Sequence, residues 1–313
     1  MKRRTLLAGA AALAAAPLAP AAHAQGGKTK IVLWHAMSGA LGEEVKRITD
    51  GFNASQGEVE VEQIFKGSYP ETLTAAIAAW RAGQAPHLVQ MFEVGTGSML
   101  AAGPAVKQVW ELSKETGIQF DPKAYLAGVR GYYSLSDGRM ASMPFNSSTS
   151  LMWYNKDAFA KAGLDPENAP TTWDAVVAAA QAIKAKNAAS IPMSSSWPTW
   201  CLFEQYAAMH DVPYATEANG FDGLGTKLLI NTPPFVKQMQ RLIDMSKDGT
   251  FKWGGRDGAA GPLFPSGDAA IMFDSSAARA SIDRAAKFKW GVALLPTDPA
   301  INAHPINSII GGA

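Results

Sequence analysis

Two tryptophans in a polar loop are the first candidates for a binding site. Trp197 and Trp200 follow the serine run 194–196 and stand three residues apart. One indole side chain can bury on the order of 150–250 Å², so two of them would be costly to leave in water. The pair predicts either a platform for an aliphatic or polyol ligand or two anchors that pin the loop to the core, and the spacing alone leaves both interpretations open.

A carboxylate and two hydroxyl clusters stand where ligands often bind. Glu93 follows 87–92, an apolar run that predicts a buried strand, and open α/β sheets hold ligands at the carboxyl ends of their strands. There it could accept hydrogen bonds from two hydroxyls of a glycerol or a sugar, or it could cap the following helix. The clusters 146–149 and 275–276 offer hydroxyls that could contact an anion or cap turns.

Sequence signatures of catalysis are absent. The chain has no Gly-x-Ser-x-Gly, no His-Glu-x-x-His and no P-loop. The run 95–97 resembles the start of a dinucleotide fingerprint, but Leu100 occupies the position of the third glycine, so a turn before a helix is the better interpretation. The histidines that follow the N-terminal segment lack metal-ligand spacing: His35, His87, His210 and His304. We therefore predict no catalytic residue, no metal site, no cofactor and no enzyme activity.

Residues 1–24 have the pattern of a secretory signal peptide. A basic start precedes an apolar run of about 13 residues, which is too short to span a bilayer because that requires about 20. Small residues at Ala22 and Ala24 suit a signal peptidase. We predict export to the periplasm by the Sec route or, because two arginines are adjacent, by the twin-arginine route.

Charge and cysteine content exclude several partners and sites. Removal of residues 1–24 lowers lysine plus arginine from 28 to 25 against 27 acidic residues, which leaves a net charge of about −2. This balance, without basic runs, argues against nucleic acid and anionic membranes as partners. Cys201 is the single cysteine, which excludes an internal disulfide and a thiolate metal site.

The periodicity of apolar residues predicts two α/β lobes. Strands alternate with helices in the first part of the chain, which is typical of a mainly parallel sheet, and the expected segments are 30–34, 41–52, 59–65, 69–82, 87–92 and a helix from Ser98. A new unit begins near Gly138, with expected strands at 139–144, 150–155 and 269–273 and expected helices at 156–163, 171–186 and 235–248. About 290 mature residues exceed the usual size of a single core.

Collinear blocks of residues resemble a known family. The segment 264–272 is similar to one shared by the type 1 extracellular solute-binding proteins, the relatives of the maltose-binding protein. Within that family, further blocks resemble the sn-glycerol-3-phosphate-binding members, namely 34–37, 66–69, 92–96, 144–149, 154–159, 162–166, 219–223 and 309–313. The resemblance runs from about Ile31 to the last residue.

The resemblance implies a fold, a function and a set of contacts. It implies a two-lobed α/β periplasmic-binding-protein fold of type II with a hinge and a ligand cleft between the lobes. Lobe 1 would comprise 28–137, lobe 2 would comprise 138–266, and 267–313 would return to lobe 1. It also implies that the ligand-binding positions are Tyr69, Glu93, Ser148, Trp197, Trp200, Ser275 and Gly312.

As the resemblance implies, the protein would capture sn-glycerol-3-phosphate or a glycerophosphodiester such as glycerophosphocholine. It would deliver the ligand, as a monomer, to the inner-membrane permease of an ABC importer. The alternatives are a binding protein for a neutral sugar or polyol and, from another class, a periplasmic phosphodiester hydrolase.

Two features depart from the resemblance. The family's further tyrosine and its phosphate-binding arginine would follow Ala313, where the chain stops in an apolar, strand-like run; because natural ends are usually polar, we expect more residues there. Asp274 stands beside Ser275 and would repel a phosphate, so we expect its side chain to point away from the ligand.

Overall fold

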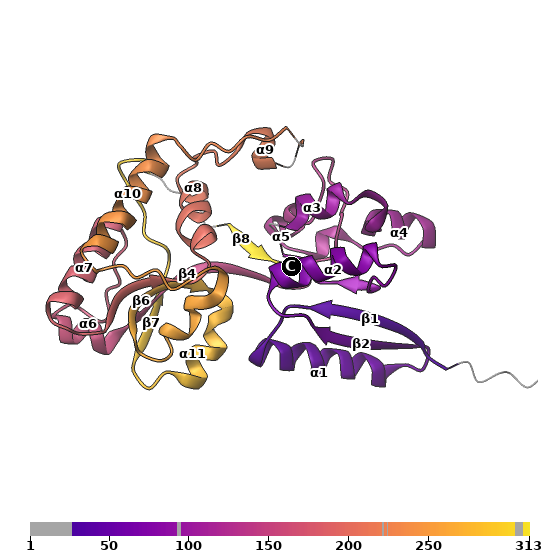
Figure 1. Ribbon diagram of the computed structural model, residues 1–313, viewed down its shortest axis with the longest axis horizontal. Coiled ribbons are helices and arrows are strands. Elements are labelled where there is room, and N and C mark those ends of the chain that lie inside the picture. Colours follow the sequence, from indigo (N-terminus) through magenta and orange to yellow (C-terminus); the bar gives the residue numbers. More distant parts are fainter. Residues whose placement is uncertain (1–26, 93–94, 221, 224, 304–308) are drawn as a thin grey trace, which may run out of the picture.

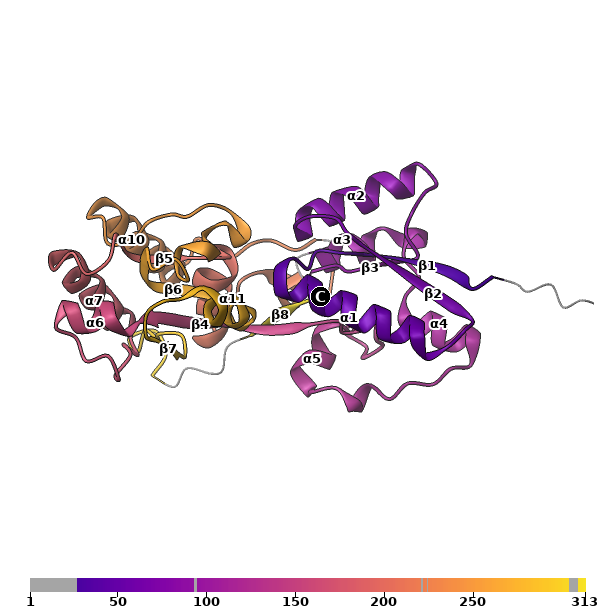
Figure 2. The same cartoon turned by 90° about the horizontal axis from the view of Figure 1, so that it is seen from below.

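The computed structural model describes residues 27–92, 95–220, 222–223, 225–303 and 309–313. The predicted signal peptide and Glu93 lie outside these residues. The described chain forms two halves side by side, each with its own sheet, and β4 (Ser147–Asn155) runs from one half towards the other (Figures 1 and 2). None of the described helices has the length and apolar character needed to cross a membrane.

The first half is built on a short parallel sheet. Its order is β2-β1-β3, and both pairings are parallel. Helices alternate with these strands as the sequence predicts, because apolar periods of two and 3.6 residues alternate along this segment. The elements are β1 (Thr29–His35), α1 (Gly39–Ser55), β2 (Val59–Phe65), α2 (Tyr69–Arg81) and β3 (Leu88–Val89).

Helix α2 begins at a capping box that also helps to build the site. The Ser68 hydroxyl accepts from the Glu71 amide, and the Glu71 carboxylate accepts from the Ser68 amide at 2.6 Å. Pro70 occupies the first turn, where a missing N–H costs nothing. The N-terminal end of α2, including Tyr69, is therefore fixed in position. Short helices complete this half: α3 (Thr96–Ala101), η2 (Gly103–Ala105), α4 (Val109–Thr116), η3 (Pro122–Ala124) and α5 (Ala127–Tyr132).

The second half is built on a mixed sheet of order β5-β6-β4-β7, with β8 paired to the start of β4. The β5–β6 pairing is parallel, and β4 is antiparallel to its three partners. Its remaining strands are β5 (Ile191–Ser195), β6 (Ala269–Ser275), β7 (Trp290–Ala293) and β8 (Ile310–Gly312). Strand β6 is buried along nearly its whole length, and several of its residues belong to the main hydrophobic core.

Helices cover this sheet and surround its edges (Figure 1). Tight turns with a left-handed backbone at Glu217, Ala218 and Asn219 make α9 irregular. The helical elements of this half are α6 (Lys156–Ala162), α7 (Trp173–Ala185), η4 (Trp200–Glu204), α8 (Gln205–Met209), α9 (Thr216–Gly220), α10 (Pro233–Lys247), η5 (Asp257–Leu263), η6 (Ser276–Ala278) and α11 (Arg279–Ala285).

A buried ionic network joins the helices beside Trp200. The Asp298 carboxylate accepts hydrogen bonds from Arg241 at 2.8 Å, from Lys237 and from the Tyr206 hydroxyl. Burial opposes ionisation of Asp298, but these two cations lower its pKa to about 2. The backbone amide of Asp298 donates to His210 at 2.7 Å. The network therefore ties α8 to α10 and to the loop after β7.

Two details of the second half differ from the sequence prediction. The expected strand at 139–144 is wrong: these residues form only an isolated bridge between Met140 and Ser134. The segment from 267 was expected to return to lobe 1, but β6 and β7 pair with β4 and β5 in the second sheet. Their partners are distant in sequence, so local periodicity carries no information about this pairing. The wider division into lobes remains a proposal.

Candidate functional site

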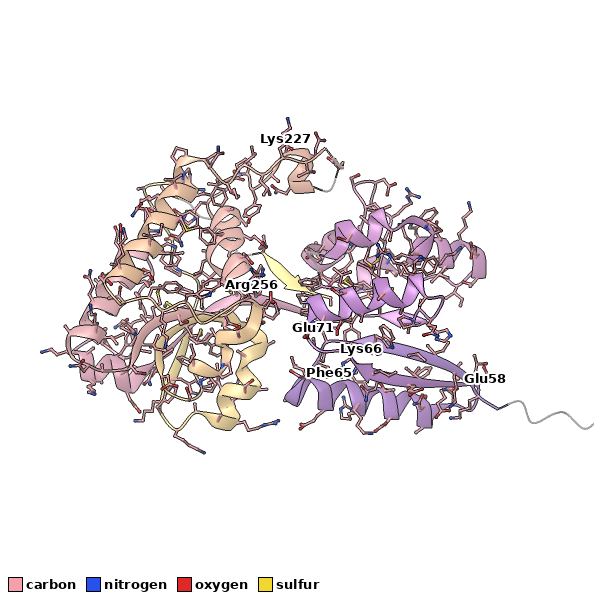
Figure 3. All side chains as sticks on the ribbon, in the orientation of Figure 1. Glu58, Phe65, Lys66, Glu71, Lys227 and Arg256 are labelled. Atoms are coloured by element: carbon pink, nitrogen blue, oxygen red, sulfur yellow. The ribbon has the colours of Figure 1, made fainter. Side chains whose placement is uncertain are left out.

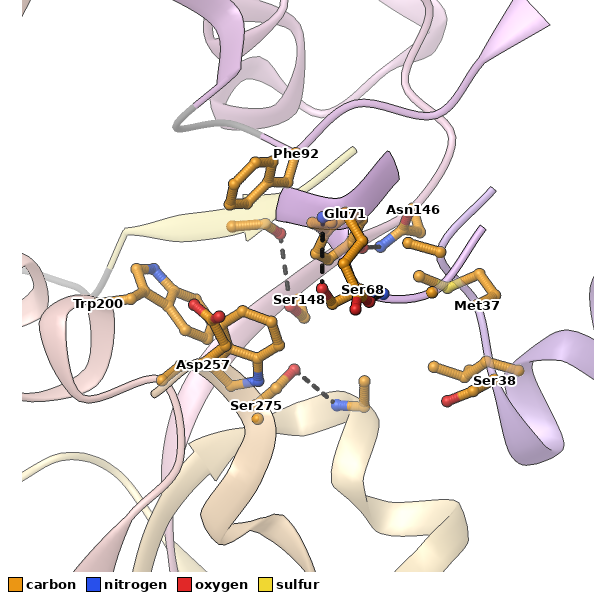
Figure 4. Close-up of a pocket in the computed structure, with 18 of the residues that line it drawn as sticks. Met37, Ser38, Ser68, Glu71, Phe92, Asn146, Ser148, Trp200, Asp257 and Ser275 are labelled. Atoms are coloured by element: carbon orange, nitrogen blue, oxygen red, sulfur yellow. Dashed lines mark hydrogen bonds between the residues drawn. The ribbon is translucent and has the colours of Figure 1, made fainter. Parts of the chain in front are cut away.

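A cavity of about 590 Å³ lies between the two halves. Residues of α2, of the end of β2 and of the segment between β1 and α1 form one wall, and residues of β6, η4 and η5 form the other (Figure 4). In Figure 4, Phe92 and Asn146 lie on one side of the space, and Trp200, Asp257 and Ser275 lie on the other. A molecule bound here would contact both halves at once.

The structure brings most of the predicted site residues together at this cavity. The five that line it are Tyr69, Ser148, Trp197, Trp200 and Ser275. Gly312 lies in β8 opposite Ser147, and its neighbour Gly311 lines the cavity. Glu93 is outside the described residues, although Phe92 beside it lines the cavity.

Trp200 and Trp197 contribute to both the core and the cavity. Trp200 begins the π-helix η4, is 8% exposed and belongs to the core cluster, but it also lines the cavity. Its indole N–H is buried and has no hydrogen-bond partner in the described part of the chain. Trp197 has a left-handed backbone (φ +49°), and its amide donates to the Asp257 carbonyl at 2.7 Å. The two interpretations of the pair, platform and anchor, are therefore compatible.

Aromatic and amide side chains organise the opposite wall. The Tyr69 ring stacks on Phe92 with centroids 5.1 Å apart, and it approaches the Trp197 ring at 6.1 Å. The Asn146 amide donates to the Tyr69 hydroxyl at 3.4 Å and accepts from Gln90 at 2.7 Å. This chain of contacts holds the Tyr69 hydroxyl at the edge of the cavity.

The serine hydroxyls already make local hydrogen bonds. Ser148 donates to the Gly311 carbonyl at 3.4 Å, and Ser275 accepts from the Ala277 amide at 3.1 Å as a cap of η6. Both residues still line the cavity. A serine hydroxyl has one donor and two acceptor positions, so neither local bond saturates it.

The sequence analysis missed the charged pair Arg256 and Asp257. Arg256 lines the cavity, and Figure 3 places it on the second half, across from Glu71 of the first. It is the only lysine or arginine among the described lining residues, and it forms no ion pair with any described residue. Asp257 has a left-handed backbone (φ +49°) and also lines the cavity. The sequence signal that could have marked them is the glycines on both sides, at 254, 255 and 258.

No metal centre is evident in the part of the chain that the structure describes. The described residues contain no group of three or more histidine, cysteine, aspartate or glutamate side chains that could hold a metal ion. Asp274 does not line the main cavity. Its carboxylate accepts instead from the Ser275 amide at 2.7 Å.

Sequence comparison identifies a family and named relatives. The family described as "Bacterial extracellular solute-binding protein" matches residues 12–311. The sn-glycerol-3-phosphate-binding periplasmic protein UgpB of Rhizobium meliloti (strain 1021) is 44% identical over 286 residues, which are 91% of this chain and 66% of that protein. UgpB of Yersinia pestis bv. Antiqua (strain Antiqua) is 44% identical over 91% of this chain and 65% of its own length. The chain thus spans slightly less than two thirds of the length of these relatives.

Solved structures with the same architecture confirm the predicted fold. UgpB from Mycobacterium tuberculosis in complex with glycerophosphocholine has a TM-score of 0.75 at 21% identity, covering 91% of this chain and 71% of that one. Maltose-bound MalE3 of T. maritima has a TM-score of 0.71 at 22% identity, also covering 91% of this chain and 71% of that one. These likenesses establish the two-lobed α/β fold of the maltose-binding-protein type, as the sequence predicts.

Proposed function

The chain belongs to the bacterial extracellular solute-binding protein family, and on this basis we propose that it is the periplasmic substrate-binding protein of an ABC importer. Its ligand would be sn-glycerol-3-phosphate or a glycerophosphodiester, which it would deliver unchanged to the inner-membrane permease. The observation that carries the proposal is the cavity between the halves, where two tryptophans, four serines and the cationic Arg256 converge.

The proposed binding mode separates the glycerol part of the ligand from its phosphate. The glycerol part packs against Trp197 and Trp200, and Glu93 accepts hydrogen bonds from its hydroxyls. The phosphate oxygens accept hydrogen bonds from four groups, namely the hydroxyls of Tyr69, Ser148 and Ser275 and the Gly312 amide.

Arg256 gives the cavity a positive charge that an anionic ligand requires. A guanidinium can form two parallel hydrogen bonds with a phosphate, which adds both energy and geometry. Glu71 also lines the cavity, but its carboxylate already accepts from the Ser68 amide in the capping box. Asp257 is a second lining carboxylate, and Arg256 is the lining cation that a phosphate could contact.

Closure of the two halves is the proposed response to binding. The ligand touches residues of both halves only when they are close together, so its binding energy favours the closed arrangement. The closed form is the one that docks on the permease. We further propose that the protein acts in the periplasm as a monomer and has no enzyme activity.

Isothermal titration calorimetry of the full-length protein tests this function. Glycerol-3-phosphate and glycerophosphocholine should bind, whereas maltose should not, and no phosphate should be released during incubation. Trp200→Ala should weaken binding at least tenfold because it removes part of the platform. Trp253→Ala is the matched control, since Trp253 is 56% exposed and does not line the cavity.

Three outcomes would count against the proposal. Selective binding of maltose would support a neutral-sugar binding protein, and release of phosphate or alcohol would indicate a hydrolase. Equal affinities of the Trp200→Ala and Trp253→Ala variants would show that the ligand binds elsewhere.

A further inference from the structure

A second cavity of about 460 Å³ adjoins the first. It lies beside β6, η5 and α11 in the second half. The two cavities are neighbours because they share six lining residues, which are Ser38, Leu41, Trp197, Gly258, Ser275 and Ala277. A ligand whose phosphate sits near Ser275 could extend into this second cavity.

The second cavity contains a buried carboxylate without a cationic partner. Asp274 lines it and is only 6% exposed. Its carboxylate accepts hydrogen bonds from the Ser275 amide and from Ser196. No lysine or arginine occurs among the described residues that line this cavity. Asp274 forms no ion pair with any described residue. An ionised carboxylate can accept about four hydrogen bonds, so part of its capacity is unused.

A buried charge of this kind is costly unless something neutralises it. Burial raises the pKa of Asp274 to about 7, against the opposing effect of its two hydrogen bonds. The carboxylate is therefore half ionised near neutral pH, and a cation placed beside it would favour the ionised form.

Three aromatic side chains are among the residues that line the second cavity. Trp153, Trp197 and Phe264 line it together with the apolar Met272 and Ile282. Aromatic faces attract cations, and quaternary ammonium groups are recognised by aromatic cages. A carboxylate among aromatic rings is thus suited to a choline or ethanolamine group, and it is poorly suited to a second phosphate.

We propose that the second cavity is a headgroup subsite for an ammonium-bearing glycerophosphodiester, with Asp274 as the counter-ion of the ammonium group. This inference rests on the proposed function of the main cavity. The phosphate would stay near Ser275 and Arg256, so the two protein charges would match the two charges of a zwitterionic ligand. Glycerol-3-phosphate has no cationic group that Asp274 could neutralise.

Three ligands separate the headgroup subsite from the phosphate site. We would titrate the full-length protein at pH 8 with glycerophosphocholine, with glycerophosphoglycerol and with glycerol-3-phosphate. Glycerophosphoglycerol has the same phosphodiester charge but a neutral headgroup. Wild-type protein should bind glycerophosphocholine at least tenfold more tightly than glycerophosphoglycerol.

Two substitutions test the subsite independently. Asp274→Asn keeps the shape but removes the charge, and should weaken glycerophosphocholine at least tenfold while changing glycerol-3-phosphate less than threefold. Gly261→Ala should have the same selective effect, because its new methyl group would lie 3.7 Å from the Asp274 carboxylate without a clash. Gly51→Ala is the matched control, since its methyl group would meet no atom within 4 Å and lies outside both cavities.

The outcomes separate a failure of the headgroup subsite from a failure of the proposed function. If wild-type protein binds none of these three ligands, the proposed function itself is wrong. If it binds them but does not prefer glycerophosphocholine, or if both variants weaken all ligands equally, the main cavity holds the ligand and the headgroup subsite is refuted.

Discussion

Substitution of Asp274 by asparagine should abolish an unusual pH dependence of stability. The carboxylate lies in the central strand β6, and burial raises its pKa from 3.8 to about 7. The titratable group that faces it is the Cys201 thiol, whose own pKa is raised well above its ordinary value by burial and then by the Asp274 charge. That thiol stays protonated through neutral pH, so Asp274 alone titrates at this position.

The sign of the effect follows from proton binding in the two states. Between about pH 4 and pH 7 the folded chain holds a proton on Asp274 and the unfolded chain does not, so the free energy of unfolding decreases as pH rises. A tenfold difference in proton affinity is worth about 1.4 kcal/mol. A pKa raised from 3.8 to about 7 therefore removes on the order of 4 kcal/mol across this range. Asparagine cannot ionise and should not lose this contribution.

Denaturant unfolding followed by tryptophan fluorescence would measure the effect at about pH 4, 5.5, 7 and 8. The stability of the Asp274→Asn variant relative to wild type should increase steadily with pH, by on the order of 4 kcal/mol in total. Asp244→Asn, at an exposed position of α10, controls for the loss of a charge and should stay within about 0.5 kcal/mol of wild type at every pH. A constant difference between wild type and Asp274→Asn across the range would refute the reasoning.

Three other substitutions probe charge, packing and acid stability. Arg256→Gln should weaken glycerol-3-phosphate at least tenfold in calorimetry and reduce the salt dependence of binding, whereas Lys252→Gln, which removes a nearby exposed charge that does not line the cavity, should leave both unchanged. Gly291→Ala should lower the free energy of unfolding by about 1–3 kcal/mol in denaturant titration, because the new methyl group would lie 2.3 Å from the ring of Tyr154; full stability would contradict the observed packing. Burial opposes ionisation of Asp298, yet its cations lower the pKa to about 2, so wild type should lose on the order of 2 kcal/mol between pH 4 and pH 2 that Asp298→Asn has already lost, and parallel stability curves would contradict this.

Local sequence patterns predicted most of the first half of the fold, although the strand expected at 87–92 is limited to Leu88–Val89. The strand predicted at 59–65 has the observed bounds of β2, and the helix predicted at 69–82 differs from α2 by one residue. Both succeed because alternation along a strand and a cap followed by a helical period are properties of neighbouring residues.

Long-range pairing was beyond those patterns. The residues at 139–144 have suitable strand composition, but among the described residues Met140 forms only an isolated bridge with Ser134. Conversely, β6 lies between β4 and β5 although more than 70 residues separate it from either along the chain. Which strands pair depends on how whole elements pack, and a single sequence does not state this.

The candidate site was predictable in part for the same reason. Clusters of tryptophan and serine are visible in the sequence, and the family resemblance joins them into one site. Arg256 and Asp257 were missed because two adjacent charged residues between glycines look like an ordinary loop. Their importance arises from the left-handed turn at Asp257, which depends on its contact with Trp197 and not on composition.

That contact explains how the cavity wall is held in shape before a ligand arrives. A left-handed backbone at a residue other than glycine costs on the order of 1–3 kcal/mol and persists only where its surroundings enforce it. Trp197 and Asp257 both have this conformation, and the 2.7 Å hydrogen bond from the Trp197 amide to the Asp257 carbonyl joins them directly. Gly258 leaves room for the Trp197 ring, since an added methyl group would lie 3.3 Å from it. The platform and the loop that carries Arg256 are thus ordered together before the ligand binds. Ligand binding therefore does not lose affinity to the entropy cost of ordering them.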